Sequence, residues 1–90
     1  MKVFWTREAQ EDVHQAFTFI SLDKPDAAER VVARLTEAGE KLGLLPHWGR
    51  AREGSKLREV AVPGLPYVLV YEVSDEAVTI ARVMHGARRR

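Results

Sequence analysis

The chain has 90 residues, 46% of them hydrophobic and 30% charged, and a formal net charge of +1, so we expect residues 1–90 to form one domain around one small core. It contains no cysteine, which excludes disulfides, thiolate metal sites and a cysteine nucleophile. No apolar run is long enough to span a bilayer and the start lacks the apolar region of a signal peptide, so we expect a cytoplasmic protein without membrane contacts.

The N-terminal third predicts a strand followed directly by a helix. Residues 2–5, K-V-F-W, are short, apolar and aromatic, as strands often are. Thr6 is a suitable N-cap, and Glu8 lies in the first turn that follows it. Apolar side chains then recur three or four residues apart, at Ala9, Val13, Ala16, Phe17 and Ile20. This spacing predicts an amphipathic helix.

A second, longer helix is predicted to begin near Pro25. Proline costs little in the first helical turn, and Asp26 lies at the positive end of the helix dipole. The apolar stripe of this helix comprises Ala28, Val31, Val32, Leu35, Ala38, Leu42 and Leu45. Gly43 and Pro46 predict its end. The short loop between the helices predicts an antiparallel helical hairpin.

Beyond the glycine-containing loop at 46–55, apolar residues recur at every second position instead of every third or fourth. Residues 57–62, 67–73 and 78–85 predict three strands, with turns at Pro63-Gly64 and at 74–76. Residues 67–71 are apolar on both faces, so their strand is expected at the centre of the sheet. The predicted fold is α+β, in the order βααβββ, with the helical hairpin packed on a small antiparallel sheet.

Six strings spread over the whole chain resemble the RelE/ParE superfamily of small toxins from type II toxin–antitoxin systems. They are W-T-R-E-A, K-P-D-A-A-E-R, L-P-H-W-G-R, L-R-E-V, P-G-L-P-Y-V-L-V-Y-E-V and R-V-M-H-G-A-R-R. The resemblance implies a toxin that is neutralised by a cognate antitoxin encoded beside it. Its target is DNA gyrase in ParE-like members and mRNA on the ribosome in RelE-like members.

A metal-free endoribonuclease would need an acid, a base and cations beside the reacting phosphate. The candidates are Arg58 and Arg82 as phosphate clamps, Glu59 as a base and His85 as an acid or base. In a regular strand Arg82 shares a face with residues 78 and 80, and His85 points to the opposite side.

Each of these residues also has a structural interpretation. His85 is suited to a hydrogen bond with the backbone at the turn made by Gly86, and Arg82 to a cross-strand pair with Glu59 or Glu72. No aromatic residue follows Tyr71, so the C-terminal tail lacks a side chain that could stack on an RNA base.

Neither a metal ion nor a nucleotide cofactor is expected. His14, His47 and His85 are predicted on a helix, in a loop and at a strand end, without the spacing of a zinc site. The glycines do not form a phosphate-binding loop.

We therefore favour a ParE-like toxin that inhibits DNA gyrase by binding, and expect it to be no enzyme. Residues 46–90 carry eight Lys/Arg against five Asp/Glu, and Arg88, Arg89 and Arg90 predict a cationic tail that contacts the target together with Arg82 and His85. Phe17, Trp48 and Tyr67 are candidate antitoxin contacts. For Trp48, capping the core is the competing interpretation. The alternative functions are a RelE-like ribonuclease and a non-toxic antitoxin-binding module.

Overall fold

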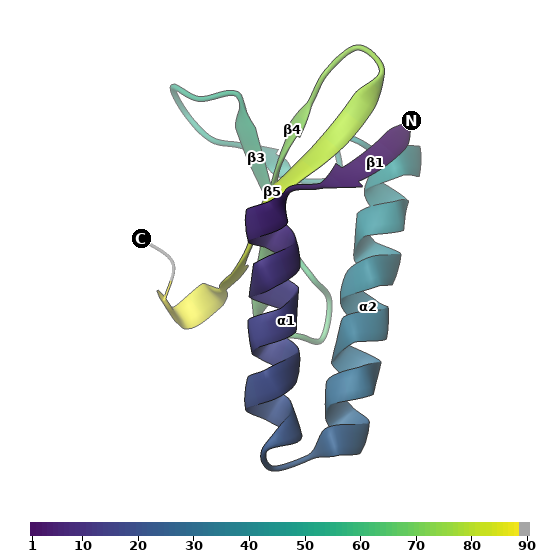
Figure 1. Ribbon diagram of the computed structural model, residues 1–90. Coiled ribbons are helices and arrows are strands. Elements are labelled where there is room, and N and C mark those ends of the chain that lie inside the picture. The colour runs from purple at the N-terminus through teal and green to yellow at the C-terminus, as the bar shows by residue number, and fades with distance from the viewer. Residues whose placement is uncertain (89–90) are drawn as a thin grey trace.

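The computed structural model describes residues 1–88 and shows two helices against one curved sheet (Figure 1). The elements in chain order are β1 (Lys2–Trp5), α1 (Arg7–Ser21), α2 (Pro25–Leu44), β2 (Arg50–Ala51), β3 (Leu57–Ala61), β4 (Tyr67–Val73), β5 (Ala77–His85) and the 3-10 helix η1 (Gly86–Arg88). No helix within this part of the chain is long and apolar enough to cross a bilayer.

The five strands lie in the order β1-β5-β4-β3-β2, so β4 is the central strand, as its apolar composition predicts. Neighbouring strands from β5 to β2 are antiparallel, but β1 pairs with β5 in parallel. The sheet is therefore mixed, and the expectation of a purely antiparallel sheet is wrong at β1. The two-residue strand β2 was not predicted either. It pairs with β3 through Arg50 opposite Glu59 and Ala51 opposite Arg58.

Both helices begin where the sequence predicts. The Thr6 hydroxyl accepts a hydrogen bond from the Ala9 N–H at 3.0 Å and so caps α1, and Pro25 occupies the first turn of α2. One stripe residue is placed differently: α2 ends at Leu44, and Leu45 is 53% exposed because it lies beyond the last turn.

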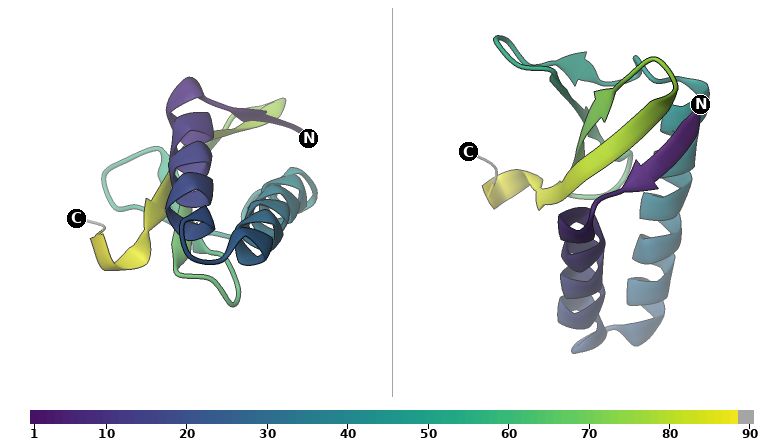
Figure 2. Two further views of the ribbon diagram at one scale, coloured as in Figure 1. Left: turned by 60° about the horizontal axis from the view of Figure 1, so that its bottom comes forward. Right: turned by 45° about the horizontal axis from the view of Figure 1, so that its top comes forward.

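The core lies between the helical hairpin and one face of the sheet. Its largest fully buried side chains are Leu35, Leu42, Leu69, Tyr71, Val78 and Ile80. Both helices run on beyond the strands, so that the α1–α2 turn lies well away from the sheet (Figures 1 and 2). The distal half of the hairpin therefore offers apolar side chains that no strand covers, including Phe19 at 69% and Leu22 at 83% exposure.

Candidate functional site

A β-bulge in β5 determines which way its side chains point. Val70 pairs with Arg82 but the next residue, Tyr71, pairs with Ile80, so Ala81 is an extra residue. Ile80 and Val83 are consequently both buried, while Arg82 points to the opposite face of the sheet. The expectation that Arg82 shares a face with residues 78 and 80 is wrong for this reason. The expectation that Arg82 and His85 lie on opposite sides is confirmed, because the strand is regular between them.

Arg82 is bound to α1 rather than to a neighbouring strand. Its Nε and Nη2 atoms donate to the two carboxylate oxygens of Asp12, at 2.8 and 3.0 Å. Asp12 Oδ2 also accepts the Val83 backbone N–H at 2.9 Å. Hydrogen bonding to Asp12, and then its negative charge, raises the pKa of Arg82 above its ordinary value. The predicted partners, Glu59 and Glu72, are therefore the wrong ones.

Arg58 is held in a network beneath the loop that follows α2. Its guanidinium donates to the Gly49 carbonyl, at 2.7 Å from Nη2 and 3.2 Å from Nε. The buried Tyr71 hydroxyl accepts the Gly49 N–H and donates to the Pro46 carbonyl, each at 2.8 Å. A Cβ at Gly49 would lie 2.6 Å from the Glu59 carbonyl oxygen, so only glycine fits there. Arg58 and Tyr71 together fix the 46–49 loop.

Glu59 lies on the face of the sheet away from the helices and forms an ion pair with Arg52. A shallow hollow of about 370 Å³ opens beside it, lined by Arg50, Ala51, Arg52, Glu59, Ala61 and Val68. Arg82 points to the same face, with Val70 between it and Glu59 across the sheet.

His85 makes the local contact that its position beside Gly86 predicts. Its Nδ1 atom accepts the Ala87 N–H at 3.2 Å, and its ring packs edge-on against Tyr67 with 5.5 Å between the ring centres. His85 and Arg58 lie on the helix-covered side of the sheet, whereas Glu59 and Arg82 lie on the open side. The four nuclease candidates thus do not converge on one cleft.

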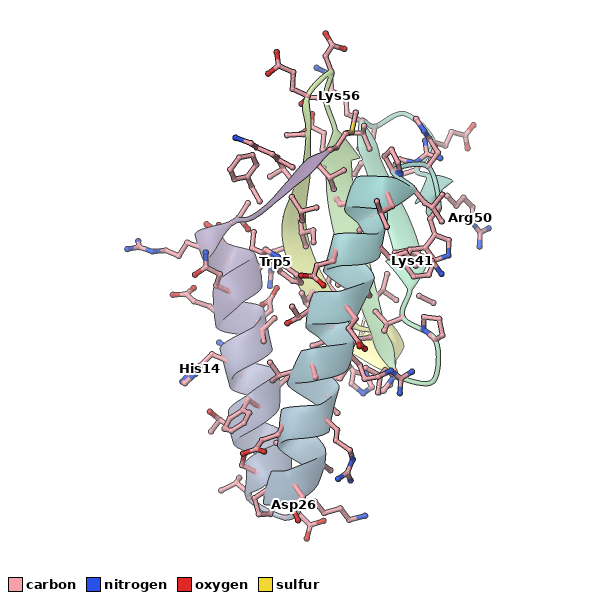
Figure 3. The ribbon with its side chains drawn as sticks, turned by 90° about the vertical axis from the view of Figure 1, so that its right-hand side faces the viewer. Trp5, His14, Asp26, Lys41, Arg50 and Lys56 are labelled. Atoms are coloured by element: carbon pink, nitrogen blue, oxygen red, sulfur yellow. The ribbon has the colours of Figure 1, made fainter. Side chains whose placement is uncertain are left out.

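A groove of about 490 Å³ runs between the distal part of the helical hairpin and the ends of β4 and β5. Phe19, Ile20, Val31 and Tyr67 form much of its apolar wall, and Asp12, Gln15 and His85 add polar groups. Of the residues expected to contact an antitoxin, only Tyr67 lines this groove. Phe17 is half-buried in α1, and Trp48 packs against the core with the Lys41 ammonium 4.2 Å above its ring (Figure 3 labels Lys41). The capping interpretation of Trp48 agrees with this packing.

Sequence reasoning missed Asp12, Phe19 and the arginines beside the hollow. Phe19 carried a usable signal, since it is a large apolar residue outside the predicted stripe of its helix. Asp12 carried none, because its partners are about 70 residues away. Arg89 and Arg90 and the side chain of Arg88 lie outside the described residues. Within residues 1–87, no three His, Asp or Glu side chains gather as metal ligands would.

Comparison with known proteins places the chain among toxins of toxin–antitoxin systems. The family model described as the ParE toxin of the type II toxin–antitoxin system parDE matches residues 3–90. Toxin RelE2 of Caulobacter vibrioides is 37% identical over 87 residues, which cover 97% of each chain.

Two solved structures share the fold. One comes from a chromosomal ParDE system of P. aeruginosa, with a TM-score of 0.85 and 22% identity over 94% of this chain and 95% of that one. The other comes from the toxin–antitoxin complex RelBE2 of Mycobacterium tuberculosis, with a TM-score of 0.69 and 27% identity over 93% of this chain and 95% of that one.

Proposed function

Because the chain belongs to the ParE toxin family of type II toxin–antitoxin systems, we propose that it inhibits DNA gyrase by binding and is neutralised by a cognate antitoxin. A relative named RelE2 matches almost the whole chain as well, so family membership alone supports both gyrase and mRNA as targets. The choice between them depends on the chemistry of the sheet.

The separation of the four nuclease candidates carries the proposal. An acid and a base must reach one phosphodiester within hydrogen-bonding distance, and here Glu59 and His85 lie on opposite faces of the sheet. Both arginines already donate to protein acceptors: Arg82 to Asp12, and Arg58 to the Gly49 carbonyl. A phosphate would have to displace these acceptors before either cation could bind it. This arrangement favours a toxin that acts by occupying a protein surface.

The groove beside the helical hairpin supports an antitoxin partner. Phe19 and Leu22 are highly exposed, so a partner that covers them would remove apolar surface from water. An amphipathic helix fits a groove with one apolar wall. The partner in the M. tuberculosis complex is an antitoxin, and we assign the same kind of partner to this groove.

The proposal is tested with the variant Glu59→Gln, which removes the candidate base and leaves His85, an expected target contact, in place. We expect this variant to arrest growth as the parent does, and both proteins to block supercoiling of relaxed plasmid by purified gyrase. Translating ribosomes given either protein should retain intact mRNA. Codon-positioned cuts that disappear in the variant would instead establish the ribonuclease. No effect in either assay would indicate the non-toxic module.

A further inference from the structure

The positive charge of the described chain is concentrated in the β2–β3 hairpin, residues 50–59. Arg50, Arg52, Lys56 and Arg58 lie within these ten residues, against Glu53 and Glu59. The rest of the chain up to residue 87 holds seven Lys/Arg and eleven Asp/Glu. A basic hairpin on an otherwise acidic body attracts a polyanion locally, although the net charge of the protein is small.

The hairpin forms a two-stranded ribbon that extends beyond the rest of the sheet (Figure 2, right). Its cations lie on both faces. Arg50 and Arg52 line the hollow on the open side of the sheet, whereas Lys56 and Arg58 border a separate depression on the opposite side. A ligand with negative charge on two flanks would therefore find cations on both sides of the ribbon.

Two of these cations are available for such a ligand. Arg58 donates to the Gly49 carbonyl and Arg52 pairs with Glu59, but Arg50 and Lys56 are exposed and make no hydrogen bond or ion pair with the described residues. Figure 3 shows the Arg50 side chain directed outward from the body of the protein, and Lys56 lies in the turn directly before β3. At Gly54 the turn has a φ of +73° and open space around it, so the tip can approach another molecule closely.

The dimensions of the ribbon favour duplex DNA among polyanions. Two paired strands lie about 4.8 Å apart, and with side chains the ribbon fits the B-DNA major groove, which is about 12 Å wide and edged by phosphates on both sides. The major groove of A-form RNA is too deep and narrow for protein side chains to enter. Single-stranded RNA is bound by aromatic stacking, and the residues that line the hollow include no aromatic side chain.

We propose that the β2–β3 hairpin binds the phosphate backbone of duplex DNA, with Arg50 and Lys56 as its principal contacts. The toxin would then hold gyrase and the DNA on which gyrase acts at the same time. This biological role rests on the proposed function, but the DNA contact itself does not depend on gyrase.

Fluorescence anisotropy tests the contact with the full-length protein and a labelled 20-bp DNA duplex, in the absence of gyrase. The variant Arg50→Gln, Lys56→Gln should bind more weakly, and the slope of log K against log salt should fall by about 2. The variant Arg7→Gln, Lys24→Gln is the matched control. It removes the same charge at the starts of α1 and α2, where loss of a cation does not destabilise the helix, and it should bind like the parent.

Two results would overturn the proposal. One is an equal loss of affinity in both double variants, which would indicate a non-specific effect of net charge. The other is binding of a 20-bp RNA duplex or a single-stranded RNA as tightly as the DNA duplex. A hairpin variant that loses DNA binding but still inhibits gyrase would leave the DNA contact established and separate it from the inhibition.

Discussion

At the scale of single residues, Asp12 connects α1 to the edge of the sheet. Beyond the end of β1, no strand among residues 1–88 pairs with β5 on that side, and the Val83 N–H donates to Asp12 instead. The same carboxylate holds Arg82. An unpaired N–H on an exposed strand edge can pair with a strand of another chain. By accepting this N–H, Asp12 stabilises β5 and also prevents such pairing.

Asp12→Ala should lower the free energy of unfolding by about 1–3 kcal/mol, because it leaves the Val83 N–H without an acceptor and also releases Arg82. Urea unfolding followed by circular dichroism measures the change. Asp12→Asn should lower the free energy of unfolding by less, since its amide oxygen can still accept the Val83 N–H. Glu11→Ala, at the exposed neighbouring position, is the control and should change stability by less than about 0.5 kcal/mol. Equal losses at positions 11 and 12 would contradict this account of Asp12.

At the scale of elements, the approach of α2 to β1 depends on glycine. A Cβ at Gly39 would lie 2.4 Å from the Trp5 ring and 3.1 Å from Ile80 Cδ1, so the helix packs directly on these side chains. Glycine within a helix costs about 1 kcal/mol relative to alanine. In α2 this less favourable residue lies at a buried position, Gly39. Close packing between the layers outweighs helix propensity here.

Gly39→Ala should therefore destabilise the protein, although alanine is the better helix former. Overpacking against the Trp5 ring costs about 1–3 kcal/mol, which exceeds the propensity gain of about 1 kcal/mol in most of that range. Thermal and urea unfolding of Gly39→Ala, Trp5→Leu and the double variant form a mutant cycle. The double variant should be more stable than the sum of the two losses implies, because leucine removes the ring that clashes. Additive losses of unfolding free energy in the two single variants would contradict direct packing of Gly39 on the Trp5 ring.

Elements with a strong internal pattern could be predicted from sequence, whereas those defined by a partner could not. The bounds of β4 agree with the prediction because residues 67–71 are apolar on both faces and turns flank Tyr67–Val73. The strand β2 has only two residues and exists because it pairs with β3. The K-V-F-W stretch predicts a strand but carries no information on its neighbour, so its parallel pairing with β5 was missed.

The same distinction applies to the candidate site. The contact of His85 lies two residues away, within reach of local reasoning. The partner of Arg82 is 70 residues away in sequence, and the bulge at Ala81 reverses the alternation from which its direction was predicted. Groups brought together by tertiary structure leave no local signal.

At the scale of the whole molecule, the helical hairpin is longer than the sheet it covers. The groove at its distal half, with Phe19 on its wall, is a surface that the fold itself leaves uncovered. Binding of a partner there should stabilise the toxin by mass action without any change in its own core.

Phe19→Ser should weaken antitoxin binding at least tenfold, because burial of a phenylalanine side chain contributes about 1.5–3 kcal/mol. The unfolding free energy of the free toxin should stay within about 0.5 kcal/mol, since Phe19 is 69% exposed. Isothermal titration with the purified antitoxin measures the affinity. Phe4→Ser, at 54% exposure on β1, is the matched control and should bind the antitoxin normally. A larger loss of antitoxin affinity at Phe4 than at Phe19 would indicate that the antitoxin binds beside β1 instead of in the groove.

The parallel pairing of β1 with β5 makes completion of the fold depend on a strand that is synthesised late. Val78 and Ile80 of β5 fill the core between β1 and β4, so a nascent chain cannot close that core until they have left the ribosome. The residues before β5 must therefore remain incompletely folded until β5 is available. A growing chain therefore cannot complete this fold before β5 has emerged.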